Sequence, residues 1–109
     1  MKTYSGQSGY VYQYYYEGQR TARDATEFVF NVSGDRKTWF PVSVFVRDRA
    51  LAAWQQRHER DLHPTERYAI SKMALFAAFD ARPSPESMRD PVEVAESQVD
   101  EILSTLNID

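Results

Sequence analysis

The stretch Tyr10-Val-Tyr-Gln-Tyr-Tyr-Tyr16 decides the fold, because aromatic and β-branched residues dominate it and favour a strand. Gly9 and Gly18 bound this stretch, and we predict a strand over about residues 10–17. Side chains alternate along a strand, so Tyr15 lies on one face of the sheet. The opposite face takes four tyrosines: Tyr10, Tyr12, Tyr14 and Tyr16.

Two more strands follow the tyrosine strand. The alternating patterns predict strands over about residues 27–33 and 37–46, joined by a turn at which Gly34 is free to adopt positive φ. Residues 19–26 are polar and predict a loop. Pro41 has no N–H to donate, so it predicts an edge position or a bulge.

Three helices occupy the rest of the chain. Apolar spacings of three and four predict helices over about residues 49–61, 64–80 and 91–106, with a linker over 81–90. The sequence Asp90-Pro-Val-Glu93 predicts the start of the last helix, because it offers an acidic cap, a proline at the first position and a glutamate near the third. Strands segregated from helices predict an α+β fold, with a three-stranded antiparallel sheet and three helices packed on one face.

Composition limits the class of protein. The 109 residues, 42% hydrophobic and 27% charged, fit one globular domain spanning 1–109. The absence of cysteine excludes a disulfide scaffold and thiol chemistry, and it fits a reducing compartment. The N-terminus lacks the apolar run of a signal peptide, and no apolar segment is long enough to span a bilayer. We therefore predict a cytoplasmic protein without membrane contact.

Charge is distributed unevenly along the chain. The net charge is −3, and residues 84–109 hold seven acidic side chains against one arginine. One interpretation is a solvated helix face. The other is that the acidic segment docks on a basic surface of its own chain or of a neighbouring chain.

The helices offer more apolar surface than a three-stranded sheet is expected to cover. Met73–Phe79 is apolar all round, so it must be covered on more than one side. The last helix adds an apolar seam, which either folds back on its own sheet or pairs with a second chain. A homodimer would cover the excess, through these candidate interface residues: Tyr10, Tyr12, Tyr14, Tyr16, Phe76, Phe79, Val99, Ile102 and Leu106.

No motif indicates catalysis or metal binding. His58 and His63 are five residues apart, about 140° around a helix, whereas a zinc helix needs its histidines four apart. The scattered glycines do not form a phosphate loop, and no serine lies in a nucleophile elbow. We predict no catalytic residue, no cofactor and no metal site.

Three functional hypotheses remain. The first is a non-enzymatic protein-interaction or homodimerising module. The second is a single-stranded nucleic-acid binder in which the tyrosine face stacks unpaired bases. The third is a small-molecule binder or enzyme with a pocket between sheet and helices, formed by Tyr15, Trp54 and His58.

Overall fold

The computed structural model describes residues 1–109, and nine elements follow one another along the chain. They are β1 (Lys2–Ser5), β2 (Val11–Ala22), β3 (Ala25–Ser33), β4 (Phe40–Arg47), α1 (Asp48–His58), α2 (Pro64–Ala81), the 3-10 helix η1 (Glu86–Arg89), β5 (Val92–Val94) and α3 (Glu96–Thr105). The predicted α+β class is confirmed, with four strands preceding the helices and one short strand inserted among them.

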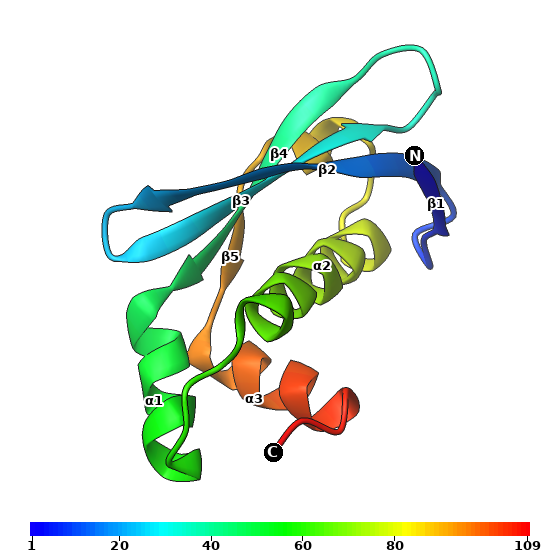
Figure 1. Cartoon of the computed structure of the whole chain (residues 1–109). Coiled ribbons are helices and arrows are strands. Elements are labelled where there is room, and N and C mark those ends of the chain that lie inside the picture. The colour runs from blue at the N-terminus through cyan, green and yellow to red at the C-terminus, as the bar shows by residue number, and fades with distance from the viewer.

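The five strands form a single sheet whose spatial order is the order in the sequence. Strands β1 to β4 pair antiparallel, whereas β5 runs parallel to β4 after a crossover that contains α1, α2 and η1. The sheet curls, and Figure 1 shows the helices gathered on one side of it. We call that side the helix face and the opposite side the outer face.

The core lies between the helix face and the helices. Alternate residues of the central strands point into it and are buried: Phe28, Phe30 and Val32 from β3, and Val42, Val44 and Val46 from β4. Leu75 and Phe79 of α2 and Val99 and Leu103 of α3 belong to the same cluster. Burial of apolar surface stabilises such a core by roughly 25 cal/mol per Å².

Strand β1 was not predicted, because it has only four residues and few of them are apolar. It is held at the edge of the sheet by contacts to α2. The Tyr4 ring stacks on Phe76 with centroids 4.3 Å apart, and the Tyr4 hydroxyl donates to Asp80 at 2.9 Å. The backbone N–H of Gln7 donates to the same carboxylate at 2.9 Å.

Strand β2 is longer than predicted. Residues 19–26, predicted as a loop, form the closed end of the β2–β3 hairpin, with Asp24 in the left-handed region at φ 56°. A bulge between Tyr16 and Gly18 changes the pairing register, and Gly18 adopts φ 144° there. The polar residues beyond the bulge remain in the strand because β3 pairs with them. The local sequence pattern gives no sign of this pairing.

The β3–β4 connection also differs from the prediction. Strand β4 begins at Phe40, so residues 34–39 form the loop, and Arg36 rather than Gly34 has positive φ, at 67°. Pro41 lies on β4 before the residues that pair with β5, so only β3 is its neighbour there. At this point of the sheet β4 has a free edge, so the missing backbone N–H of Pro41 does not interrupt a ladder with β5.

The predicted start of the last helix was wrong. Val92 and Val94 are buried on β5 beside β4, and α3 begins only at Glu96. A strand is favoured because alternate valines complete the sheet, an arrangement that the helical spacing of Val92 concealed. The predicted linker over 81–90 contains η1, and α1 ends at His58 rather than near 61.

Two of the seven acidic side chains in residues 84–109 pair with basic side chains of the same chain, and the other five are exposed without an ion pair. Glu93 of β5 pairs with Arg47 at 2.6 Å, and Asp100 of α3 forms an ion pair with Arg57 of α1. Both pairs are substantially exposed to solvent. Each therefore contributes at most about 1 kcal/mol to stability.

The expectation that the helices carry more apolar surface than the sheet can hide was wrong. Phe79 and Val99 have no exposed surface, and Phe76 and Ile102 pack half-buried against the core. Leu106 is half-buried as well. The sheet has two more strands than predicted and it curls, so it covers α2 and α3 within one chain.

Candidate functional site

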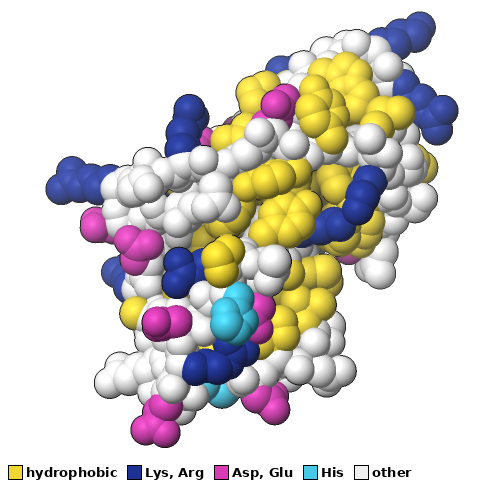
Figure 2. Space-filling model, viewed as in Figure 1, with side chains coloured by type: hydrophobic (Ala, Val, Ile, Leu, Met, Phe, Trp, Pro, Cys, Tyr) yellow, Lys and Arg dark blue, Asp and Glu magenta, His cyan; other side chains and the backbone are white.

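The tyrosine strand divides into a buried part and an exposed part. Tyr12 and Tyr14 are 0% and 4% exposed, and they point into the core. Strand β2 and the residue before it nevertheless supply four of the five large hydrophobic side chains that are exposed: Tyr10 (39%), Val11 (44%), Tyr15 (40%) and Tyr16 (38%). Figure 2 shows hydrophobic side chains gathered on the surface where the sheet meets α2.

The second part of β2 also has an unpaired edge. Strand β1 pairs only with Val11–Tyr14, whereas β2 continues to Ala22. The remaining residues, Tyr15–Ala22, therefore have β3 on one side and no strand on the other. We call Tyr15–Ala22 the free segment of β2. Such an edge presents backbone donors and acceptors that another strand can use.

Two tyrosines flank the free segment on opposite faces of the sheet. On the outer face, the Tyr15 hydroxyl accepts from the Asn31 amide at 2.7 Å, and its ring lies 5.5 Å from that of Trp39. On the helix face, the Tyr16 ring meets Tyr68 of α2 edge-on at 4.8 Å. These contacts fix both rings in place, so they would lose little conformational entropy on binding.

A polar network stabilises the outer face next to the free segment. The Arg20 guanidinium donates twice to Glu27, at 2.6 and 3.1 Å, and Ser43 donates to the same carboxylate. These hydrogen bonds lower the pKa of Glu27, Arg20 being the largest cause. The carboxylate is ionised and fully occupied by partners of its own chain, so we assign it a structural role.

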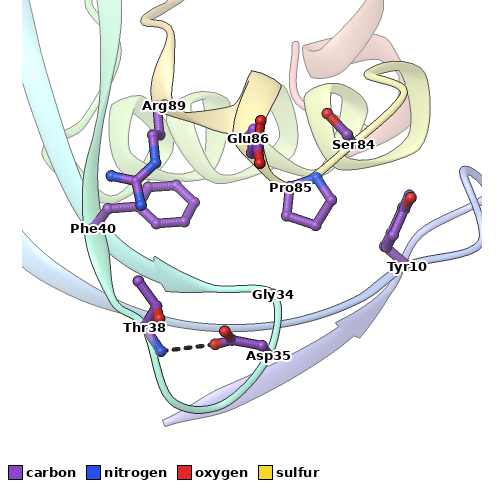
Figure 3. A pocket seen from close by; sticks show the side chains of 9 residues that line it. All are labelled: Tyr10, Gly34, Asp35, Thr38, Phe40, Ser84, Pro85, Glu86 and Arg89. Atoms are coloured by element: carbon purple, nitrogen blue, oxygen red, sulfur yellow. Dashed lines mark hydrogen bonds between the residues drawn. The ribbon is translucent and has the colours of Figure 1, made fainter.

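A cleft lies at the end of the sheet away from the β2–β3 turn. Its volume is about 450 Å³, and residues from three separate parts of the chain line it (Figure 3): Tyr10, Gly34, Asp35, Thr38, Phe40, Ser84, Pro85, Glu86 and Arg89. The loop before β4 forms one wall, and the connection from α2 through η1 forms the other. Any side chain at position 34 would clash with Pro85 on the opposite wall, because its Cβ would lie 2.8 Å from the Pro85 Cβ.

The charged groups of the cleft have different environments. The Asp35 carboxylate accepts from the backbone N–H groups of Thr38 and Lys37, at 2.7 and 2.8 Å, and these bonds lower its pKa to about 2. The Arg89 guanidinium lies over the Phe40 ring, 4.4 Å from its centroid, and makes no hydrogen bond or ion pair with the protein. Glu86 likewise forms no ion pair.

The predicted interface residues are distributed over several environments. Four of them lie in the core and cannot contact a partner: Tyr12, Tyr14, Phe79 and Val99. Three are half-buried against the rest of the chain: Phe76, Ile102 and Leu106. Only Tyr10 and Tyr16 are exposed, over 39% and 38% of their surface.

The residues predicted to form a pocket do not come together. Trp54 and His58 stack on α1 with ring centroids 4.0 Å apart, and the His58 Nδ1 lies 3.0 Å from the Trp54 carbonyl oxygen. Tyr15 lies on the outer face, so the sheet separates it from both. The structure contains no group of three or more His, Asp and Glu side chains able to hold a metal ion, and no helix long and apolar enough to span a membrane.

Sequence reasoning missed the cleft residues Phe40, Glu86 and Arg89. Phe40 was interpreted only as a strand residue, and residues 86–89 lay in the predicted linker. The one local signal was the turn chemistry around Gly34 and Asp35. In the comparisons with known proteins, the chain matches no protein-family model, no curated protein and no solved structure.

Proposed function

We propose that this protein is a non-enzymatic protein-interaction module that forms a homodimer through the free segment of β2. The observation that carries the proposal is the coincidence of an unpaired strand edge, Tyr15–Ala22, with two exposed and pre-positioned tyrosines, Tyr15 and Tyr16. Backbone hydrogen bonds along an edge supply affinity, and tyrosines are enriched in the cores of interfaces.

Charge complementarity favours a second copy of the chain as the partner. Glu17 and Arg20 have opposite charges and both lie on the free segment. If two free segments pair antiparallel around a twofold axis between Gly18 and Gln19, Glu17 of each copy lies opposite Arg20 of the other, and Arg20 then shares its guanidinium between this residue and Glu27 of its own chain. The charged side chains disfavour strands with an unmatched charge pattern. The bulge at Gly18 shortens the regular ladder open to any partner, a second copy included.

Light scattering coupled to size-exclusion chromatography tests the proposal. At tens of micromolar we expect the wild-type chain to elute with twice the mass of one chain. Glu17→Lys places like charges opposite each other at the two symmetry-related contacts with Arg20, so we expect it to shift the protein to the monomer. Glu101→Lys makes the same charge change on the exposed surface of α3 and should leave the dimer intact. A monomeric wild type under these conditions would contradict the homodimer.

The second hypothesis requires an exposed face of tyrosine rings on which bases can stack, and this face is mostly covered. The rings of Tyr12 and Tyr14 are buried in the core, and Tyr16 is covered on one side by Tyr68. We therefore do not propose nucleic acid as a partner. The absence of cysteine supports a reducing compartment such as the cytoplasm for the proposed module.

A further inference from the structure

We propose that the cleft between the β3–β4 loop and η1 binds a small zwitterionic molecule with a carboxylate and an ammonium group, such as a free α-amino acid. The cleft lies at the opposite end of β2 from the free segment, so this site is separate from the proposed dimer surface. The argument rests on Arg89, Glu86 and the walls that hold them.

Arg89 is positioned to receive the carboxylate. Its guanidinium lies over the Phe40 ring, 4.4 Å from the centroid, on the exposed rim of the cleft, and its donors have no partner in the protein. The Phe40 ring itself is almost completely buried, so it forms a firm base for the guanidinium. Two parallel N–H donors match the two oxygens of a carboxylate, and charge-assisted pairs of this kind are about twice as strong as neutral hydrogen bonds.

Glu86 is positioned to receive the ammonium group. Glu86 and Arg89 are three residues apart on a 3-10 helix, where side chains at this spacing lie on the same side. They nevertheless form no ion pair, because Arg89 lies against Phe40 (Figure 3). Two opposite charges therefore line one cleft without neutralising each other, and a ligand carrying both charges can pair with each of them.

Asp35 adds a negative charge to the cleft, although its carboxylate is held by backbone hydrogen bonds of its own loop. The backbone donors of Thr38 and Lys37 keep it ionised, with its pKa lowered to about 2. The cleft thus holds two carboxylates and one guanidinium. This balance disfavours a simple anion and favours a ligand with a positive group as well.

The walls of the cleft suit a small molecule. A volume of about 450 Å³ is at the lower end of the range of ligand pockets, roughly 300–1,000 Å³. A Cβ at Gly34 would lie 2.8 Å from the Pro85 Cβ and 3.6 Å from the Tyr12 Cε1, so glycine keeps this end of the cleft open.

Titration of ¹⁵N-labelled protein with individual α-amino acids, followed by NMR, tests the proposal. We expect saturable shifts of the backbone amides of Thr38, Phe40 and Arg89 with at least one amino acid at millimolar concentration. The N-acetyl derivative and the amide of the same amino acid each lack one charge, and we expect each to bind about tenfold more weakly or worse.

Variants assign the two charges. Arg89→Met keeps an apolar side chain against Phe40 and should weaken binding of the amino acid by about tenfold or more. Glu86→Gln should remove the preference for the amino acid over its N-acetyl derivative. Arg49→Met, which removes an exposed arginine of α1 outside the cleft, should change nothing. The absence of saturable shifts with every amino acid, or equal weakening by Arg49→Met, would overturn the proposal.

Discussion

The two parts of β2 have similar sequences and opposite environments. In the first part, Tyr12 and Tyr14 lie between β1 and β3 and their rings pack against Phe79 of α2. In the second part, Tyr15 and Tyr16 lie on a strand with one neighbour and expose about 40% of their surface. The difference has two causes. Tyr15 alternates onto the outer face, and Tyr16, on the helix face, lies beyond the residues with which β1 pairs. Residue type therefore decided that β2 is a strand, and the neighbours decided which tyrosines became core.

The largest expected effect is a difference in the free energy of unfolding between variants in the buried part and in the exposed part of β2. Tyr12→Ala removes a ring that stacks on Phe79 with centroids 4.2 Å apart, and it leaves a cavity. We expect it to lower the free energy of unfolding by about 3–5 kcal/mol. Tyr15→Ala removes a ring that is partly exposed already and should cost about 1 kcal/mol or less. Urea denaturation monitored by fluorescence compares them, and equal losses would show that the two parts are not distinct.

A smaller effect concerns the hydroxyl groups. Tyr12→Phe removes a completely buried hydroxyl that has no partner in the protein, so we expect the free energy of unfolding to rise by about 1 kcal/mol. Tyr4→Phe is the matched control, because the Tyr4 hydroxyl donates to Asp80 at 2.9 Å. That variant should lower the free energy of unfolding by a similar amount. If both variants shift stability in the same direction, the hydroxyl of Tyr12 has a partner after all.

The smallest effect appears at alkaline pH. Burial raises the pKa of Tyr12 above its ordinary value of 10.0, with Tyr10 adding to the effect, and burial likewise raises the pKa of Tyr14. The unfolded chain then loses these protons first, so stability that is present below about pH 10 declines as the pH rises through the folded pKa.

Denaturation between about pH 9 and pH 11 measures this decline. Tyr12→Phe should make the decline shallower, because one ionising group is gone from the core. Tyr15→Phe is the control, because it makes the same substitution at an exposed tyrosine. A decline that is unchanged in Tyr12→Phe would show that this phenol does not contribute to alkaline unfolding.

The sequence correctly predicted the elements that are determined by residues close together in the chain. The start of α2 is one example, because the Pro64 ring suits the first turn and Glu66 accepts from the backbone N–H of His63 at 2.8 Å. The three long strands are another. The alternation of Tyr12 and Tyr14 correctly placed them on one face, although it could not tell that α2 covers that face.

Pairing partners could not be predicted in the same way. Strands β1 and β5 are short and exist because β2 and β4 offer them an edge. Val92 fits a helix and a strand equally well, and only the presence of β4 beside it decides between them. The cleft is similar: Arg89 meets Phe40 across a separation of almost half the chain, so no spacing in the sequence links them.

The crossover between β4 and β5 has a consequence for the order of events during synthesis. The four antiparallel strands leave the ribosome first and can pair as successive hairpins, because their contacts are close in sequence. Strand β5 follows only after both long helices have been made, and until then Val44 and Val46 border an open edge. A nascent chain at this stage is exposed to aggregation through that edge. Three residues near the C-terminus, Val92–Val94, thus protect a sheet that was assembled long before them.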